Sequence, residues 1–80
     1  MFFVYVLNSK SRKYIYVGLT DNTARRISQH NEGKERTTRA YAPFDCIHVE
    51  GFATRIEARQ CEKYLKSGVG KEWLKRKYSL

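Results

Sequence analysis

FFVYVLNSKSRKYIYVGL, residues 2–19, is the stretch of sequence that decides the fold. Residues 2–7 and 13–19 are rich in aromatic and β-branched side chains, which favour extended strands. The polar residues 8–11 interrupt these two runs. Two such runs around a short polar segment predict a β-hairpin with its turn at residues 8–11.

The second strand of this hairpin has two different faces, because side chains alternate along a strand. Its aliphatic residues fall on one face: Ile15, Val17 and Leu19. The other face carries Tyr14, Tyr16 and Gly18. We expect the aliphatic face to pack on the core and Tyr16 to lie on the more polar face. Gly18 then allows backbone or a ligand to approach closely.

One helix and a basic loop are predicted after the hairpin. Thr20 or Asp21 can cap a helix that runs to about Asn31, and Gly33 can end it in the left-handed conformation. Residues 33–43 show no periodicity and hold three basic residues among threonines. This composition predicts a mobile basic loop.

The remaining residues predict a third strand and two further helices. The strand covers about residues 44–50 and stops at Gly51. Thr54 and Glu57 have the spacing of a capping box, in which each side chain satisfies a free backbone N–H at the start of a helix. Ser67-Gly68 is expected to end that helix, and residues 70–77, anchored by Trp73 and Leu74, predict a short third one.

The composition limits the chain to one small domain, residues 1–80, that folds and carries an excess of positive charge. Eighty residues are too few for two domains, and 41% hydrophobic residues argue against disorder. The net charge is +8, from 16 Lys and Arg against 8 Asp and Glu. Such an excess favours nucleic acid as a partner over a membrane surface, although it also serves solubility alone.

The cysteines and the chain start point to a cytoplasmic protein. Cys46 and Cys61 form neither a CxxC motif nor a zinc-ligand spacing, so we expect reduced thiols. The apolar run 1–7 lacks a basic start and is far too short to span a bilayer. Nothing in the sequence favours dimerisation, so a monomer with no membrane association is expected.

The order of several short motifs resembles the GIY-YIG nuclease domain family. These are Tyr5, Tyr16-x-Gly18, Asn22-x3-Arg26-x3-His30 and Glu62, in that order along the chain. The resemblance covers nearly the whole chain and is closest to the short single-domain branch of the family, similar to the N-terminal nuclease domain of the bacterial excinuclease. It implies an α+β fold with a small three-stranded antiparallel sheet flanked by about three helices.

Two positions depart from the family pattern. Phe3 stands where the first motif has glycine, and Leu19 follows Gly18 where some members carry lysine. Without that lysine, abstraction of a proton from the attacking water would fall on a tyrosine or on metal-bound water.

The resemblance implies DNA phosphodiester hydrolysis with Mg²⁺ or Mn²⁺, and Glu62 is the expected metal ligand. A single carboxylate is a plausible anchor for Mg²⁺, which keeps several waters and takes ligands from substrate phosphate. On the predicted helix Glu62 lies about 40° beyond the edge of the buried stripe, at a rim. The bare sequence favours another interpretation, an exposed ion pair of Glu62 with Arg59 or Lys66.

The resemblance assigns four further residues to catalysis: Tyr5, Tyr16, Arg26 and His30. Either tyrosine would orient or deprotonate the water, which requires nearby positive charge or metal because an unperturbed tyrosine has a pKa near 10. Arg26 would bind the phosphate with its planar fork, and His30, one helical turn further, would hydrogen-bond that phosphate or pass a proton. The simpler interpretations are packing tyrosines, a solvent-facing arginine and a polar surface histidine.

Five basic residues are predicted to contact the nucleic-acid backbone without sequence preference. They are Arg25, Arg26, Lys34, Arg36 and Arg39. Gly18 is structural under every interpretation.

Two other functions stay open from the sequence. One is a nucleic-acid-binding module that has lost useful turnover, which Phe3, Leu19 and the small size favour. The other is a nuclease subunit that needs a protein partner. The resemblance implies a role in DNA repair or recombination, whereas the preferred DNA structure and the cleavage sequence do not follow from these residues.

Overall fold

The computed structural model describes residues 1–80 and contains three strands and three helices. The strands are β1 (Phe2–Ser9), β2 (Ile15–Thr20) and β3 (Phe44–Phe52), and the helices are α1 (Thr23–Asn31), α2 (Arg55–Lys66) and α3 (Gly68–Tyr78). A short 3₁₀ turn, Arg39–Tyr41, lies between α1 and β3. The predicted α+β class, with three strands and three helices, is confirmed.

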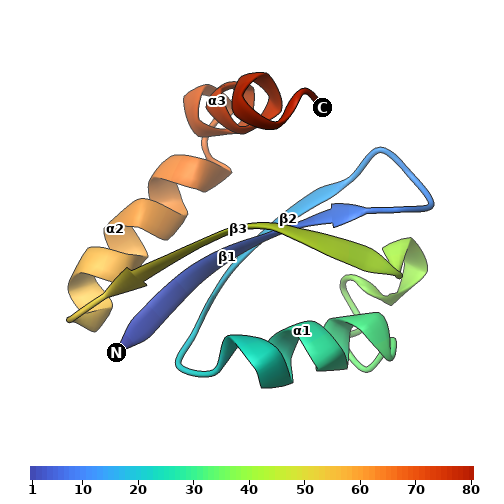
Figure 1. Cartoon of the computed structure of the whole chain (residues 1–80), viewed down its shortest axis with the longest axis horizontal. Helices are drawn as coiled ribbons and strands as arrows, with labels where there is room; N and C mark the ends of the chain where they lie inside the picture. The colour runs from blue at the N-terminus through green and yellow to red at the C-terminus, as the bar shows by residue number, and fades with distance from the viewer.

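The sheet is antiparallel throughout, with β1 in the centre and β2 and β3 at the edges. Tyr5 of β1 lies opposite Gly18 on β2 and opposite Val49 on β3. The hairpin predicted from residues 2–19 therefore forms, and it places the two tyrosine-bearing strands side by side. Its turn covers residues 10–14 and not 8–11, because Asn8 pairs with Ile15 and β1 continues to Ser9. In Figure 1 the helices α2 and α3 lie on one side of this sheet and α1 on the other.

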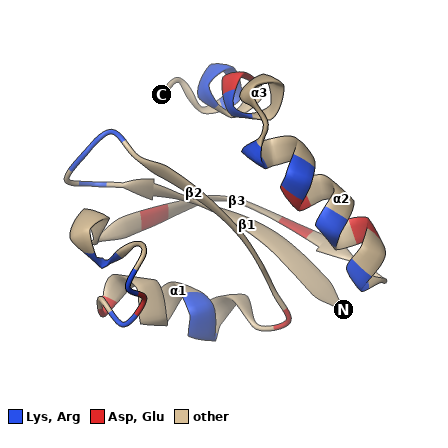
Figure 2. Ribbon diagram, turned by 180° about the vertical axis from the view of Figure 1, so that it is seen from behind, with Lys and Arg blue, Asp and Glu red and all other residues tan.

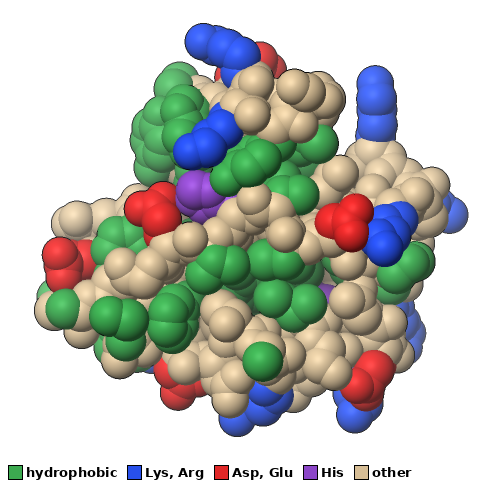
Figure 3. Space-filling model, viewed as in Figure 1, with side chains coloured by type: hydrophobic (Ala, Val, Ile, Leu, Met, Phe, Trp, Pro, Cys, Tyr) green, Lys and Arg blue, Asp and Glu red, His purple; other side chains and the backbone are tan.

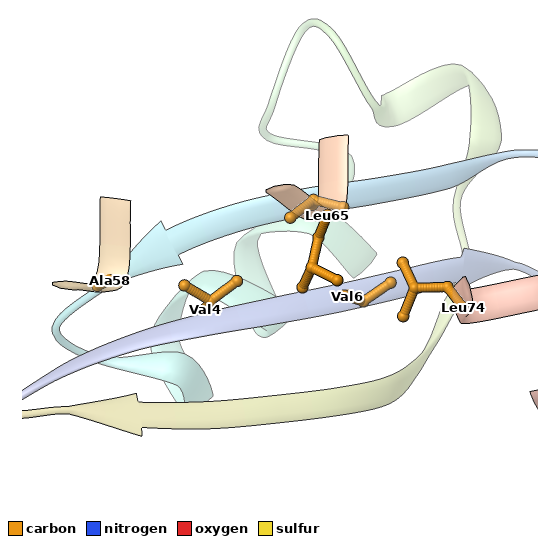
Figure 4. Packing of buried hydrophobic residues seen from close by; sticks show 6 residues of the cluster. Val4, Val6, Ala58, Leu65 and Leu74 are labelled. Carbon is orange, nitrogen blue, oxygen red and sulfur yellow. The ribbon is translucent and has the colours of Figure 1, made fainter. Parts of the chain in front are cut away.

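The larger core lies between the sheet and the helices α2 and α3. Its buried members are Val4, Val6, Val17, Ala58, Leu65 and Leu74, and Ile15 and Leu19 pack against them. Figure 4 shows side chains of α2 and α3 meeting the valines of β1. Full burial of such a side chain contributes about 1.5–3 kcal/mol. The prediction that Ile15, Val17 and Leu19 face the core is confirmed.

A smaller cluster covers the opposite face, beneath α1. Tyr5, Leu7 and Phe44 are buried there, with Tyr16 and Ile27 packed against them. The face of Tyr16 is therefore the more aromatic and polar of the two, as its alternation with Val17 predicts.

The ends of α1 differ in part from the expectation. Asn22 is the N-cap, and its side chain accepts a hydrogen bond from the backbone N–H of Arg25. Thr20 and Asp21 are not the cap, because the Thr20 hydroxyl instead accepts the backbone N–H of Asn22 in the preceding turn. Gly33 has φ 74°, which confirms the left-handed residue after the helix.

Two further boundaries lie outside their predicted positions. β3 continues through Gly51 to Phe52, because Gly51 pairs with Phe3 in the β1–β3 ladder. α3 begins at Gly68, where Ser67 caps it by accepting the backbone N–H of Gly70. One of the two hydrogen bonds of the capping box predicted at the start of α2 is confirmed. The Thr54 hydroxyl accepts the backbone N–H of Glu57.

The segment 33–43 is more ordered than the mobile loop that its composition predicts. The 3₁₀ turn Arg39–Tyr41 follows Thr38, which is fully buried. Ser9 donates its hydroxyl hydrogen bond to the carbonyl of Tyr41, and the Asn31 side chain accepts the backbone N–H of Phe44. These contacts join residues far apart in sequence, so no local pattern reveals them.

Candidate active site

A chain of three buried side chains lies between β1 and α1. The Tyr5 hydroxyl is 2.9 Å from Nε2 of His30, and Nδ1 of His30 is 2.8 Å from the Thr38 hydroxyl. Tyr5 is 1% exposed, and His30 and Thr38 are 0% exposed. Each ring nitrogen of His30 therefore has a partner, and the imidazole is held at both ends.

Gly18 makes room for the ring of Tyr5. A Cβ at position 18 would lie 2.4 Å from both Cζ and Oη of Tyr5, well inside van der Waals contact. Gly18 is not among the glycines with positive φ, so its conformation does not require glycine. The close approach expected at Gly18 is made by the Tyr5 side chain across the hairpin, and β2 can carry no side chain at this place.

Tyr16 borders this cluster on the edge strand β2 and is half-buried. Its ring centroid is 4.8 Å from that of His30 and 6.2 Å from that of Tyr5. Of the two tyrosines, Tyr16 is the more accessible from solvent because no strand pairs with the outer side of β2.

Arg26 lies on the same helix as His30 and has an acidic partner. Its guanidinium forms an ion pair with Glu35 and donates a hydrogen bond to the Gln29 side chain at 2.8 Å. The Arg26 side chain is 25% exposed, so it is neither a free surface arginine nor a buried one. The guanidinium beside it holds the pKa of Glu35 below its ordinary value, and this carboxylate is therefore ionised at neutral pH.

Burial, and not the neighbouring arginine, decides the pKa of Tyr5. Burial and then Tyr16 raise it to about 12, against an opposing contribution from Arg26. The nearby arginine therefore does not bring the pKa of Tyr5 below its ordinary value in the free protein. At neutral pH this residue is a protonated phenol that can donate a hydrogen bond.

The expected direct contact between His30 and phosphate does not fit this geometry. The ring is fully buried and both nitrogens already have partners. Burial, with a smaller effect of Arg26, lowers the pKa of His30, so the imidazole is neutral at pH 7. The expectation of a surface histidine is equally wrong. His30 instead forms hydrogen bonds with Tyr5 and Thr38.

Glu62 comes from the other layer of the molecule. It lies on α2, 3.3 Å from the Lys66 ammonium and 3.8 Å from the Arg59 guanidinium, so the ion pairs considered from the sequence both form. Its side chain is only 11% exposed, which is deeper than an ordinary surface ion pair. No hydrogen bond joins Glu62 to Tyr5, Tyr16 or Arg26.

The position of Glu62 around α2 nevertheless turns it toward the β2 edge of the sheet. Cys61 and Tyr64 line a cavity with Glu50 and Phe52 of β3, so that side of α2 faces β3. At about 100° per residue, Glu62 falls on the opposite side of the buried stripe formed by Ala58 and Leu65. Since the strand order is β2-β1-β3, that side is the β2 side. Tyr16 and Glu62 therefore border the same sheet edge from opposite faces.

Four of the five predicted backbone-contacting residues are exposed, Arg26 is half-buried, and three of the five, Arg26 among them, have acidic partners. Arg25 is 3.5 Å from Asp21, and Lys34 is 3.0 Å from Glu32. The remaining two, Arg36 and Arg39, are exposed without an ion pair.

The whole chain except its last two residues matches one family model, that of the GIY-YIG catalytic domain, over residues 1–78. The chain belongs to the GIY-YIG family. A UPF0213 protein of Streptococcus pneumoniae is 40% identical over 65 residues, which cover 80% of this chain and 65% of that protein. The chain thus spans just under two thirds of the length of this curated relative.

Another relative of this GIY-YIG domain carries a functional name, structure-specific endonuclease subunit SLX1 of Homo sapiens. It is 36% identical over 67 residues, which cover 78% of this chain and 24% of that protein. The solution NMR structure of a UPF0213 protein from Bacillus halodurans has a TM-score of 0.56 and 35% identity over 92% of this chain and 82% of that chain. Of these relatives, SLX1 is named an endonuclease subunit, whereas the UPF0213 names state no activity.

The acidic residues of this GIY-YIG domain fit a metal ion held by a single protein ligand. No group of three His, Cys, Asp or Glu side chains lies close enough to form a protein-only metal site. Glu62 is a shielded carboxylate on the β2 side, and one carboxylate suffices for Mg²⁺ when substrate phosphate and water supply the other ligands. Separately, none of the helices combines the length and apolar character needed to span a bilayer.

Two side chains of the cluster were not predicted from the sequence. Both lie in the segment that the composition predicts as a mobile loop. Thr38 contacts His30, and Glu35 contacts Arg26. Their spacing from these partners along the chain follows no helix or strand period. Only the tertiary structure reveals them.

Proposed function

We propose that this protein is a divalent-metal-dependent endonuclease that hydrolyses DNA phosphodiester bonds at the β2 edge of its sheet. The observation that carries the proposal is the position of Tyr16 and Glu62, which border one sheet edge from opposite faces, with Tyr5 beside Tyr16 and Arg26 beside Tyr5. Hydrolysis needs a base for water, positive charge for the phosphorus transition state and support for the leaving oxygen. These residues offer all three.

Arg26 is the proposed phosphate-binding residue. Its guanidinium already holds the Glu35 carboxylate, an anion of similar geometry to two phosphate oxygens. A DNA phosphate would replace Glu35 on the same planar fork. The partial burial of Arg26 strengthens this interaction relative to that of a fully exposed arginine such as Arg25.

The two tyrosines receive different roles. Tyr5 is 1% exposed, is held by His30 and lies beside Arg26 and Tyr16, so we assign it to positioning these two residues for the phosphate and the water. Tyr16 is half-buried at the sheet edge, where water can reach it, and we assign it to orienting or deprotonating the attacking water. His30 and Thr38 are positioning residues, because neither is exposed to substrate.

Glu62 is the proposed ligand of Mg²⁺ or Mn²⁺. When bound, the ion would lower the pKa of water and offset the negative charge that develops on the phosphate oxygens. Lys66 and Arg59 form ion pairs with this carboxylate in the free protein.

The test is cleavage of linear, flap and branched DNA by the purified protein, with Glu62→Gln and Glu57→Gln as a matched pair. Both substitutions remove one negative charge from α2. Glu57, however, belongs to the first turn of the helix, which Thr54 caps, and lies on the β3 side. We expect cleavage by the parent and by Glu57→Gln in Mg²⁺ or Mn²⁺, and loss of at least about 100-fold in Glu62→Gln. Absence of cleavage on every DNA form, or full activity of Glu62→Gln, would refute the proposal.

A partner-dependent nuclease subunit is the second candidate. SLX1 is named a subunit, and the face seen in Figure 3 has hydrophobic side chains across its middle and Lys and Arg toward its rim. Exposed Val49, Tyr64 and Trp73 are 47%, 49% and 38% accessible. In that case the isolated chain would bind DNA without cutting it, and an added partner would restore cleavage. A binding module without any turnover would stay inactive with every partner.

A further inference from the structure

A second basic site lies between the β1–β2 hairpin and the last helix. A cavity of about 360 Å³ is lined there by Lys13 of the hairpin, by Lys71 and Lys75 of α3, and by Asn8, Tyr14 and Ile15. Figure 2 shows the basic hairpin turn and the basic turns of α3 at the same end of the molecule. Three ammonium groups from two separate elements thus border one hollow.

None of these three lysines has an acidic partner. The ion pairs of the protein use other lysines, namely Lys10, Lys34 and Lys66. Like charges without a counterion repel each other, and Lys71 and Lys75 are also four residues apart on one helix, a spacing that is unfavourable for two cations. A concave site with three unneutralised ammonium groups favours an anion.

Helix stability does not explain Lys71. The first turn of α3 contains no acidic residue, and Lys71 lies close to that positive end of the helix dipole, where a cation is disfavoured. Lys75 lies in the last turn, where a cation is favoured, so it has a structural explanation of its own. The unfavourable placement of Lys71 therefore points to a role outside the folding of α3.

The cavity is next to the proposed reaction site along β2. Ile15 lines it, and Tyr16 is the following residue of the same edge strand. Side chains alternate along a strand, so Ile15 points toward α2 and α3 and Tyr16 toward α1. The cavity and Tyr16 therefore border neighbouring parts of β2, on opposite faces of the sheet.

We propose that the cavity formed by Lys13, Lys71 and Lys75 binds a second backbone phosphate of the DNA strand that is cut. This site rests on the proposed function for its ligand. It gives the small domain a second contact on the strand and so fixes the direction in which DNA crosses the β2 edge. Lysine suits this task because phosphate here is held by charge, without the planar geometry of arginine.

The test is binding of labelled DNA to the full chain in EDTA over a range of salt, so that cleavage plays no part. The double variant Lys71→Ala/Lys75→Ala is compared with Lys63→Ala/Arg76→Ala. Both pairs lose two positive charges from exposed positions, the first pair on α3 and the second on α2 and α3, but only the first pair lines the cavity. Circular dichroism melting identifies any variant that fails to fold, in which case Lys13→Ala, in the hairpin turn, replaces the double variant.

We expect the cavity variant to lower the slope of log K against log salt by about 0.7–0.9, the loss of one phosphate contact, and the control by less than half of that. The difference should vanish with a dinucleotide, which is too short to reach both sites. Equal slopes for the two variants, or a parent that binds no DNA, would overturn the inference. Cleavage by the parent together with equal slopes would overturn it alone and leave the proposed function standing.

Discussion

Gly18→Ala tests whether the packing of Tyr5 across the hairpin requires a residue without a side chain. Position 18 has no positive φ, so alanine is acceptable to the backbone. The new Cβ would lie 2.4 Å from Cζ and Oη of Tyr5 and 2.7 Å from Cε1. Ordinary carbon contacts are about 3.5–4.0 Å, so the Tyr5 ring has to move by roughly 1 Å or more.

The expected loss of stability follows from two contributions. Overpacking a buried side chain costs about 1–3 kcal/mol. Displacing the ring also weakens the 2.9 Å hydrogen bond between Tyr5 and His30, which is worth about 1 kcal/mol. The sum is about 2–4 kcal/mol. For a domain of this size it lowers the Tm by at least about 8 °C.

The assay is a double-mutant cycle by urea unfolding with Tyr5→Leu as the second substitution. Leucine lacks the three ring atoms that meet the new Cβ, so Gly18→Ala should cost less than about 0.5 kcal/mol in the Tyr5→Leu background. The predicted coupling free energy is therefore at least about 1.5 kcal/mol. An equal cost of Gly18→Ala in both backgrounds would refute the explanation from the Tyr5 ring.

Three further predictions concern stability and binding. Gly70→Ala should lower the free energy of unfolding by about 3 kcal/mol, because its Cβ would meet the backbone of Tyr64 and Leu65. In the same urea assay the control Gly68→Ala, whose Cβ would have nothing within 4 Å, should change this free energy by less than about 1 kcal/mol. Folding raises the pKa of Tyr5 from 10.0 to about 12, so its contribution, on the order of 2 kcal/mol, is fully present below pH 10 and is lost as pH rises toward 12. Unfolding free energies at about pH 9 and about pH 11.5 should therefore differ less in Tyr5→Phe than in the parent, and an equal difference would contradict the burial of this phenol. Glu35→Gln should raise DNA affinity about two- to fivefold by freeing Arg26. The control Glu32→Gln removes the same charge from an exposed ion pair with Lys34 and should raise the affinity less. Equal increases would mean that net charge alone determines the affinity.

The strands, the start of α2 and the end of α1 follow from the sequence because their causes are local. Alternation in residues 13–19 separates an aliphatic from an aromatic face, and both faces pack as expected. Thr54 and Gly33 act at helix ends through the backbone next to them, so their roles follow from residue type and position. The same holds for the α+β class, which the family motifs also imply.

The interior of the candidate site does not follow in this way. A helical pattern places His30 one turn from Arg26, but only the packing of Thr38 and Tyr5 around the ring makes it a buried, neutral imidazole. Likewise Glu35 neutralises Arg26 across eight intervening residues, 27–34. These contacts depend on where segment 33–43 returns to the sheet, which no periodicity in that segment encodes.

For Glu62 the sequence predicts the position of the side chain but does not decide its role. Its spacing from Ala58 and Leu65 predicts a carboxylate at the rim of the buried stripe, and the side chain is 11% exposed. The same spacing equally predicts the ion pairs with Arg59 and Lys66, and these form as well. Sequence and fold therefore agree on its position, whereas its proposed metal-binding role depends on the substrate.

The most direct measurement is the anomalous scattering of Mn²⁺ in crystals of the protein with DNA that carries a non-hydrolysable linkage. We predict an ion about 2.0–2.2 Å from a Glu62 carboxylate oxygen and from a phosphate oxygen, with that phosphate also contacting Arg26 and Tyr16 at the β2 edge. An ion bound elsewhere, or DNA lying across the β3 edge with Glu62 still paired only to Lys66 and Arg59, would contradict the proposed site.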